Sequence, residues 1–508
     1  MKKIFPILMR WMVPGFGSML FTAAFFGALL FGPRMMNIDG DLGRHITIGR
    51  YILDTRSIPT IDLFSHTMAG QPLTPHEWLS QVIFALAHAW MGLNGVVLVT
   101  GVVIAASFGL LFGMVRGAGR SLLPAVAVTV LAMAASSLHW LTRPHIFTFL
   151  MLALWLKVLV DLRAGKKRNW WLLPFIMLVW ANLHGAFIAG FVVWAIFGTG
   201  TAWDAFWYRQ PAPAGFWRSY LFGGLASLIA TLANPSGIGL WATSTGYIGN
   251  RYLVGHTAEY LPPNFHEPVT WPFLLMIGLL VLLLGLRSRR VDSAWVMLSA
   301  AWLVMALYSA RNIPLFAIVS APLLAVLAAD LWSEMRARSR VMTHLYEMDQ
   351  RLLNIDIRQR GWILPLLVLI LAAAALNSGV PLDSDQRGNI YDPLVFPVQA
   401  AGWLDQHPQQ GNMFNHFPWG GYLLYRHWPE RPVFIDGQTD FYGENLTRQY
   451  EKVLTLAPGW EDVLDQYHVD WVIIPTSGDL AGEMRSSAHW ETVYRDDTAV
   501  IFNKVERP

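Results

Sequence analysis

Two carboxylates, Asp39 and Asp41, are separated by one residue in a polar segment that follows the first apolar stretch of the chain. At this spacing they can bind a divalent cation (Mg, Mn or Ca) through hard oxygen ligands. Alternatively, one of them serves as a general base whose pKa is set by burial or by a nearby Arg44. The plain structural alternative is that Asp41 only caps a helix over 42–53, as its N-cap residue, and that Asp39 is a turn residue. The spacing alone leaves these interpretations open.

Other polar side chains occur where apolar stretches begin or are broken. His76 and Glu77 are either ordinary residues of a helix start at the membrane surface or a second acidic site facing Asp41. Arg143 and Arg311 each precede an apolar stretch, where an arginine binds a phosphate or extends its charge to the membrane surface. The candidates are Glu77 as a further catalytic group and, as substrate- or phosphate-binding groups, His45, His76, Arg143, His145, His184 and Arg311.

The elements that position these residues are predicted to be membrane-spanning helices. Of the 508 residues, 54% are hydrophobic and only 14% are charged, whereas a soluble domain has about 25% charged residues. This composition excludes a disordered chain and disfavours an ordinary soluble enzyme. About 20 apolar residues cross a bilayer, and we expect eleven spans, at 11–31, 93–115, 121–138, 144–162, 169–183, 185–203, 217–233, 271–286, 293–310, 313–332 and 362–376.

The distribution of basic residues predicts the orientation of these helices. Lys and Arg gather in cytoplasmic loops, and with the N-terminus inside most basic residues before position 377 fall on the inner side. This orientation requires residues 78–91 to lie as a helix on the outer interface instead of crossing. The first apolar run is full length, so we expect a retained helix and not a cleaved signal peptide. The first outer loop, 32–77, and the other candidate residues then face the outer side.

The C-terminal part differs in charge and in pattern. Residues 377–508 contain 9 Lys and Arg against 19 Asp and Glu, whereas the rest contains 28 against 15. We expect a membrane module at 1–376, a linker at 377–393 and a soluble α/β domain at 394–508, placed outside by the odd number of spans. Residues 436–440 follow a predicted strand and are interpreted as an acceptor-binding or docking segment, with a simple turn as the alternative. The predicted strands are 412–416, 432–436, 470–475, 491–495 and 499–503.

Several chemistries are excluded. Cysteine is absent, so disulfides, thiolate metal sites and a cysteine nucleophile cannot occur. The chain has no phosphate-binding or dinucleotide-binding glycine motif. No basic stripe with interleaved aromatic residues occurs, and nucleic acid is therefore not an expected partner.

The layout of the chain resembles the GT-C superfamily of membrane glycosyltransferases, in particular a bacterial subgroup with a C-terminal soluble domain. A large acidic outer loop follows the first helix, and an interface helix and about ten further spans come after it. The likeness covers most of the chain, and its strongest motifs lie in the first loop. The residues that carry it are Asp39, Asp41 and His45, then Ile58-Pro59, Asp62 and Phe64-Ser65, then His76-Glu77-Trp78-Leu79, Arg143-Pro144-His145, Arg311-Asn312, Trp419-Gly420-Gly421-Tyr422 and Phe434-Ile435-Asp436-Gly437.

This resemblance implies an enzyme that passes a sugar from a polyprenyl-phosphate carrier to a glycan, lipid or protein acceptor outside the membrane. Asp41 then becomes the base or a metal ligand, Asp39 becomes its partner, and Arg143 and Arg311 become candidates for the lipid phosphate. The implied location is a bacterial inner membrane, with the C-terminal domain in the periplasm. The Asp-Glu pair of protein mannosyltransferases and the Trp-Trp-Asp signature of oligosaccharyltransferases are missing, so donor and acceptor stay open. A transporter or flippase, or a non-catalytic assembly factor for a surface glycan, is the alternative.

Overall fold

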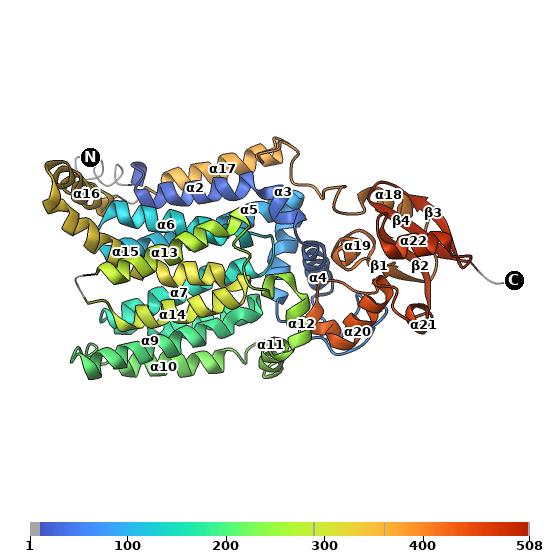
Figure 1. Cartoon of the computed structure of the whole chain (residues 1–508), viewed down its shortest axis with the longest axis horizontal. Helices are drawn as coiled ribbons and strands as arrows, with labels where there is room; N and C mark the ends of the chain where they lie inside the picture. The colour runs from blue at the N-terminus through green and yellow to red at the C-terminus, as the bar shows by residue number, and fades with distance from the viewer. Residues whose placement is uncertain (1–10, 288–289, 360, 506–508) are drawn as a thin grey trace.

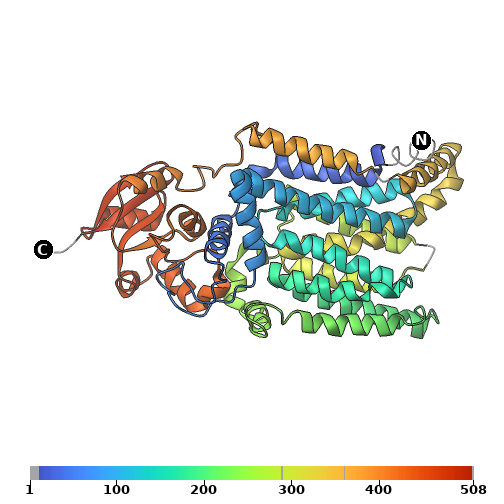
Figure 2. The same cartoon turned by 180° about the vertical axis from the view of Figure 1, so that it is seen from behind.

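The computed structural model describes residues 11–287, 290–359 and 361–505. A bundle of long helices occupies one part of the molecule and a small α/β domain the other (Figure 1). The helix α4 lies between the two parts, as the view from behind also shows (Figure 2). The basic segment before residue 11, whose position was used to orient the chain, lies outside the described residues.

The helices of the bundle and of its end nearest the C-terminal domain are connected by turns and several longer loops, among them 56–77 and 257–270. Their bounds are α2 Phe16–Leu30, α3 Gly32–Asn37, α4 Asp41–Thr55, α5 Trp78–Gly119, α6 Leu122–Ser136, α7 His145–Arg163, α8 Leu172–Leu183, α9 Ile188–Trp207, α10 Phe216–Ala230, α11 Gly239–Gly249, α12 Arg251–His256, α13 Trp271–Leu286, α14 Ser293–Tyr308, α15 Ile313–Met335, α16 Arg340–Arg358 and α17 Ile363–Asn377. The chain is a multi-pass membrane protein, because several of these helices are long and strongly apolar.

The predicted number of eleven spans is not confirmed. Among the described residues six helices are long and apolar enough to cross a bilayer, and α16 with α17 form a bent pair that would make a seventh. Helices lie within all eleven predicted stretches, but α8 has 12 residues and α17 has 15, which is short of a full crossing at 1.5 Å per residue. The six are Trp78–Gly119, Leu122–His139, His145–Arg163, Gly185–Trp207, Pro268–Leu286 and Ala310–Arg338.

Two predicted interruptions of apolar helices are confirmed. α5 is broken at Met91 and Gly92, where Gly92 has a φ of +59°, a conformation that glycine adopts readily. Residues 78–91 therefore form a helix separate from the following span. The second break is at His184, which has an extended backbone between α8 and α9.

The C-terminal part is an α/β domain, as expected. Its sheet has the order β1-β2-β4-β3, with β1 and β2 parallel and the other two pairs antiparallel. Successive residues of β2 point to opposite faces, so that Trp471 and Ile473 pack in one core while Val472 and Ile474 pack in the other. The elements are α18 Val398–Gln406, β1 Asn412–Asn415, α19 Gly420–His427, α20 Thr439–Leu454, α21 Trp460–Gln466, β2 Val469–Pro475, α22 Asp479–Ser486, β3 Trp490–Arg495 and β4 Ala499–Lys504.

The strand predicted at 432–436 is wrong. This segment is buried and extended, but it pairs with the first loop and not with the sheet. Val433 makes an isolated bridge to Ser65, with the Val433 amide donating to Phe64 O at 3.0 Å and the His66 amide donating to Val433 O at 3.0 Å. The first loop therefore satisfies backbone groups of the C-terminal domain that a neighbouring strand would otherwise satisfy.

Helix α4 joins the two parts through a close backbone contact. A Cβ on Gly43 would lie 2.2 Å from Gly421 O, and a Cβ on Gly421 would lie 2.2 Å from Gly40 O. Only glycine permits this approach of α4 to the start of α19. On the same helix Ile48 and Ile52 belong to one hydrophobic core of the C-terminal domain.

Candidate active site

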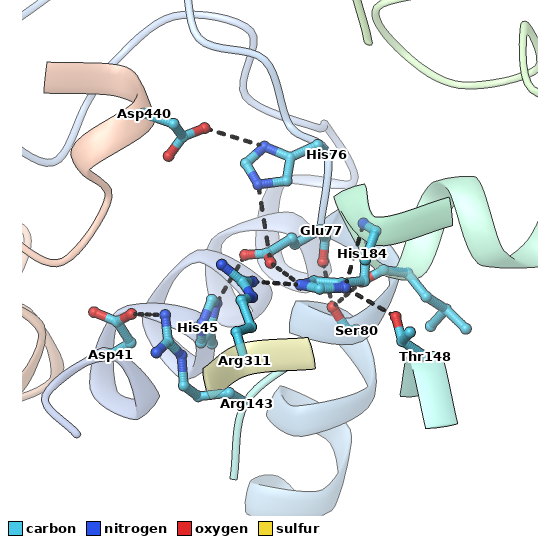
Figure 3. A network of polar contacts seen from close by, with 12 residues as sticks. Asp41, His45, His76, Glu77, Ser80, Arg143, Thr148, His184, Arg311 and Asp440 are labelled. Carbon is cyan, nitrogen blue, oxygen red and sulfur yellow. Dashed lines mark hydrogen bonds and ion pairs between the residues drawn. The ribbon is translucent and has the colours of Figure 1, made fainter. Parts of the chain in front are cut away.

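The candidate residues meet at the end of the bundle that faces the C-terminal domain (Figure 3). Asp41 is the first residue of α4 and follows Gly40. The Asp41 amide donates a hydrogen bond to Asp39 Oδ1 at 3.0 Å. The plain structural interpretation holds for Asp39, which forms a turn, but not for Asp41: Gly40 is the N-cap of α4, Asp41 lies in its first turn, and the helix has no side-chain cap at Gly40. Both carboxylates nevertheless have further partners.

Arg143, two residues before α7, binds both first-loop carboxylates. Its Nη1 lies 2.6 Å from Asp39 Oδ2, and its Nη2 lies 2.7 Å from Asp41 Oδ2. A third carboxylate, Glu259, lies 3.5 Å from Nη1. Burial alone would lower the pKa of Arg143, but these carboxylates raise it well above its usual value. Arg143 is therefore a charged member of the site.

Arg311, before α15, binds the other side of Glu259. Its Nη1 lies 3.2 Å from Glu259 Oε1 and donates to the Tyr260 hydroxyl at 2.5 Å. Its Nη2 lies 3.3 Å from His184 Nε2. Burial raises the pKa of Glu259, but Arg311 and Arg143 outweigh burial and lower it to about 2. The Glu259 carboxylate therefore bridges the two arginines.

Glu77, which immediately precedes α5, has three histidines around its carboxylate. His184 Nε2 lies at 3.7 Å, His45 Nδ1 at 3.8 Å and His76 Nε2 at 3.9 Å. Arg44 Nη2 lies at 3.8 Å on the same carboxylate. These contacts are longer than hydrogen bonds, in contrast to the short contacts of Asp41. Glu77 is thus a second acidic group of the same network.

The histidines of the site differ in their partners. His184 Nδ1 lies 2.9 Å from the hydroxyl of Thr148, which fixes the ring. His45 is buried, and neither of its ring nitrogens has a hydrogen-bond partner among the residues that the structure describes. Burial, with Arg44 and Arg143 nearby, lowers the pKa of His45 well below its usual value. His145 Nε2 contacts the backbone oxygen of His139 at 2.7 Å. This nitrogen is therefore bound to the backbone, and His145 lies beside the network.

The C-terminal domain contributes side chains that the sequence did not connect with the first loop. Arg44 Nη1 donates to Gln438 Oε1 at 2.6 Å, and Arg44 Nε lies 3.7 Å from Asp436 Oδ1. Asp440 Oδ2 lies 3.7 Å from His76 Nδ1. Burial raises the pKa of Asp436 to about 6, although Arg44 opposes this shift. The segment 436–440 therefore packs on the site. In the sequence, only Arg44 and the polar character of the turn hinted at this contact.

The carboxylate pair does not form a metal cage in this arrangement. Among the described residues no group of three or more His, Asp or Glu side chains is placed to hold a metal ion. The oxygens of Asp39 and Asp41 contact the guanidinium of Arg143, so a divalent cation would have to displace it. Metal binding by Asp39 and Asp41 stays a prediction, and no step below depends on it.

Taken together, the helices and the polar cluster define a membrane protein with a charged site between its bundle and its α/β domain. No protein-family model matches the chain, and no curated protein matches it by sequence. Solved structures match it over most of its length. One is ArnT from Cupriavidus metallidurans bound to undecaprenyl phosphate, with a TM-score of 0.53 and 13% identity, covering 96% of this chain and 98% of that chain. Another is the oligosaccharyltransferase AglB from Archaeoglobus fulgidus in complex with an inhibitory peptide and a dolichol-phosphate, with a TM-score of 0.57 and 12% identity, covering 96% of this chain and 74% of that chain.

The resemblance to GT-C membrane glycosyltransferases is therefore confirmed at the level of the fold. Both matched proteins have this fold, and the chain has it over nearly its full length. At this identity the match concerns the architecture. A shared fold does not determine the chemistry of a site.

Proposed function

We propose that the protein is a membrane glycosyltransferase that transfers a sugar from a polyprenyl-phosphate-linked donor to an acceptor at the outer face of the membrane. The observation that carries the proposal is the 2.7 Å contact of Asp41 with Arg143 between the GT-C bundle and the C-terminal domain. A carboxylate that accepts a proton and a guanidinium that binds a phosphate are the two groups this transfer needs. The polyprenyl phosphates bound to ArnT and AglB support the choice of carrier.

In the proposed reaction the acceptor hydroxyl oxygen forms a bond to the anomeric carbon of the sugar. The bond from that carbon to the phosphate oxygen breaks, and its electron pair stays on the phosphate. The hydroxyl proton passes to Asp41, with Asp39 as its neighbour in the turn. Arg143 and Arg311 bind the phosphate and stabilise the charge that develops on it. Glu77, with His45, His76 and His184, binds the polar groups of the substrates.

The proposed orientation places the C-terminal domain outside a bacterial inner membrane and the N-terminus in the cytoplasm. Helix α4, which begins with Asp41, lies at the end of the bundle next to the C-terminal domain, while α16 lies at the opposite end (Figure 1). α16 carries Arg340, Arg351 and Arg358, and basic residues favour the cytoplasmic side. This distribution supports the proposed sidedness.

The test uses purified protein in lipid nanodiscs with a panel of undecaprenyl-phosphate-linked sugars, and it measures the polyprenyl phosphate that is set free. Asp41→Asn is expected to slow the reaction by about 10²- to 10⁴-fold, the usual contribution of a positioned general base. Asp54→Asn, an exposed position of the same helix, is the matched control and is expected to match the wild type.

Addition of EDTA separates the metal prediction from the base prediction. Loss of activity with EDTA would support a cation at Asp39 and Asp41. Equal rates for Asp41→Asn and wild type would remove Asp41 from the mechanism. If none of the donors gives release of polyprenyl phosphate and Asp41→Asn still functions normally in cells, the transporter or assembly-factor alternative would be favoured.

A further inference from the structure

Glu259 belongs to the site, but it is not among the candidates predicted from the sequence and has no role in the proposed transfer reaction. It lies in a single turn, Ala258–Tyr260, within the segment between α12 and α13. Its two oxygens contact two different arginines, with Oε2 at 3.5 Å from Arg143 and Oε1 at 3.2 Å from Arg311. A carboxylate shared by two guanidiniums has the charge and the bridging geometry of a bound phosphate.

The carboxylates at this point already balance the charges of the two arginines, so an additional anion is disfavoured. Asp39, Asp41 and Glu259 contact Arg143, and Arg311 is the one further arginine that Glu259 contacts among the described residues. Because Glu259 is ionised, with its pKa lowered to about 2, a phosphate placed beside it would meet a like charge. One anion has to leave before the phosphate of a donor binds here.

We propose that Arg143 and Arg311 form the binding site for the phosphate of the lipid donor and that the Glu259 side chain occupies this site until the donor displaces it. The inference rests on the proposed function and adds to it a residue that competes with the substrate. The ligand class is a phosphate ester, and the lipid chain distinguishes it from free phosphate.

The surroundings indicate that the Glu259 side chain moves while its backbone stays. Ser309 Oγ donates to Glu259 O at 3.2 Å, and the Ala310 amide donates to Leu261 O at 2.9 Å. These bonds fasten the turn to the segment that carries Arg311, so rotation of the side chain is the available motion.

The two arginines keep their positions when Glu259 turns away. Arg311 retains the hydroxyl of Tyr260 at 2.5 Å and the ring of His184 at 3.3 Å. Arg143 retains Asp39 at 2.6 Å and Asp41 at 2.7 Å. The phosphate site is therefore preorganised by contacts that do not involve Glu259.

The test measures binding of farnesyl phosphate, farnesol and inorganic phosphate to the full-length protein in nanodiscs. Glu259→Gln removes the competing charge and is expected to bind farnesyl phosphate about tenfold more tightly than the wild type, as expected for loss of one charge-assisted contact. Glu259→Asp keeps the charge on a shorter side chain that bridges poorly, and an intermediate affinity is expected. Glu267→Gln removes an exposed carboxylate from the same segment and is expected to leave the affinity unchanged.

Each outcome decides a different point. Weaker or equal binding by both Glu259 variants, with wild-type binding intact, overturns the displacement and leaves the proposed function in place. Equal affinity for farnesyl phosphate and farnesol in the wild type overturns the phosphate site and the donor assignment together. Inorganic phosphate that binds as tightly as farnesyl phosphate overturns the lipid donor as the ligand. The proposal is supported if Glu259→Gln binds farnesyl phosphate most tightly, Glu259→Asp less tightly and the wild type least tightly.

Discussion

Gly437 offers a direct test of whether the C-terminal domain positions the first-loop carboxylate. A Cβ built on Gly437 would lie 1.5 Å from Asp41 Oδ1 and 2.5 Å from Asp41 Cγ. The backbone of Gly437 is not among those with a positive φ, so alanine fits the backbone and the conflict is steric. Asp41 has to move by about 1.5 Å to bring this contact to the 3.0 Å below which real Cβ contacts essentially do not occur.

The cost of Gly437→Ala follows from this displacement. The 2.7 Å contact of Asp41 with Arg143 cannot survive a shift of that size. Overpacking of a buried site destabilises a protein by about 1–3 kcal/mol. A misplacement of about 1 Å at a reacting group costs about 10²-fold in rate. We therefore expect a lower unfolding temperature and a rate of polyprenyl phosphate release at least about 10²-fold lower.

Two readouts and a matched variant make the test specific. Unfolding is followed by the melting temperature in nanodiscs, and turnover is followed by the donor panel. Gly482→Ala in α22 has no atom within 4 Å of its Cβ, so a gain of about 0.5–1 kcal/mol from helix propensity and unchanged turnover are expected. Gly437→Ala with a wild-type melting temperature and rate would refute the idea that the C-terminal domain fixes Asp41.

Two further predictions concern buried carboxylates. Burial, which outweighs the opposing effect of Arg143, raises the pKa of Asp39 from 3.8 to about 7. Between about pH 4 and 7 the folded state therefore binds a proton at Asp39 that the unfolded state lacks. The free energy of unfolding should fall as the pH rises through this range. Asp39→Asn should flatten the melting temperature over this range, and a slope equal to that of the wild type would contradict the assignment. Asp349 of α16 accepts hydrogen bonds from Ser121 Oγ at 2.6 Å, Leu122 N at 2.9 Å and Leu123 N at 2.7 Å, which caps α6. Asp349→Ala should lower the free energy of unfolding by about 1–2 kcal/mol and leave farnesyl phosphate binding unchanged; loss of binding with unchanged stability would show that the residue acts otherwise.

Features with a local cause could be predicted from the sequence. The helical spacing of apolar residues in 42–53 predicts α4, and a carboxylate is favoured near its start, although Gly40 and not Asp41 is the N-cap. The break at His184 follows from polar residues within an apolar run. The strands of the C-terminal domain, apart from 432–436, follow from short apolar runs separated by turns. Each of these signals lies within a few residues of the feature it predicts.

Features with a tertiary cause could not be predicted in this way. Hydropathy marks an apolar run but does not fix where its helix ends, and the length of the helix decides whether it crosses the bilayer. The apolar residues of 432–436 resemble a strand, yet the backbone of Val433 pairs with the first loop. Glu259 lies in a loop with no sequence motif around it, and its role depends on arginines that precede α7 and α15. Arg44 and Gln438 are far apart in the chain and meet because α4 packs on α19.

The contacts of α4 argue that the first loop and the C-terminal domain form one functional unit. Removal of residues 394–508 would expose Ile48 and Ile52, which are buried in a core of that domain. It would also remove Gln438 and Asp436 from the buried Arg44, and a buried charge without its partners is costly. A truncated chain would therefore lose the position of α4, and with it Asp41, even if the domain made no contact with an acceptor. Single substitutions such as Gln438→Ala, which leave the shared core intact, are the variants that separate the positioning of Arg44 from the folding of α4.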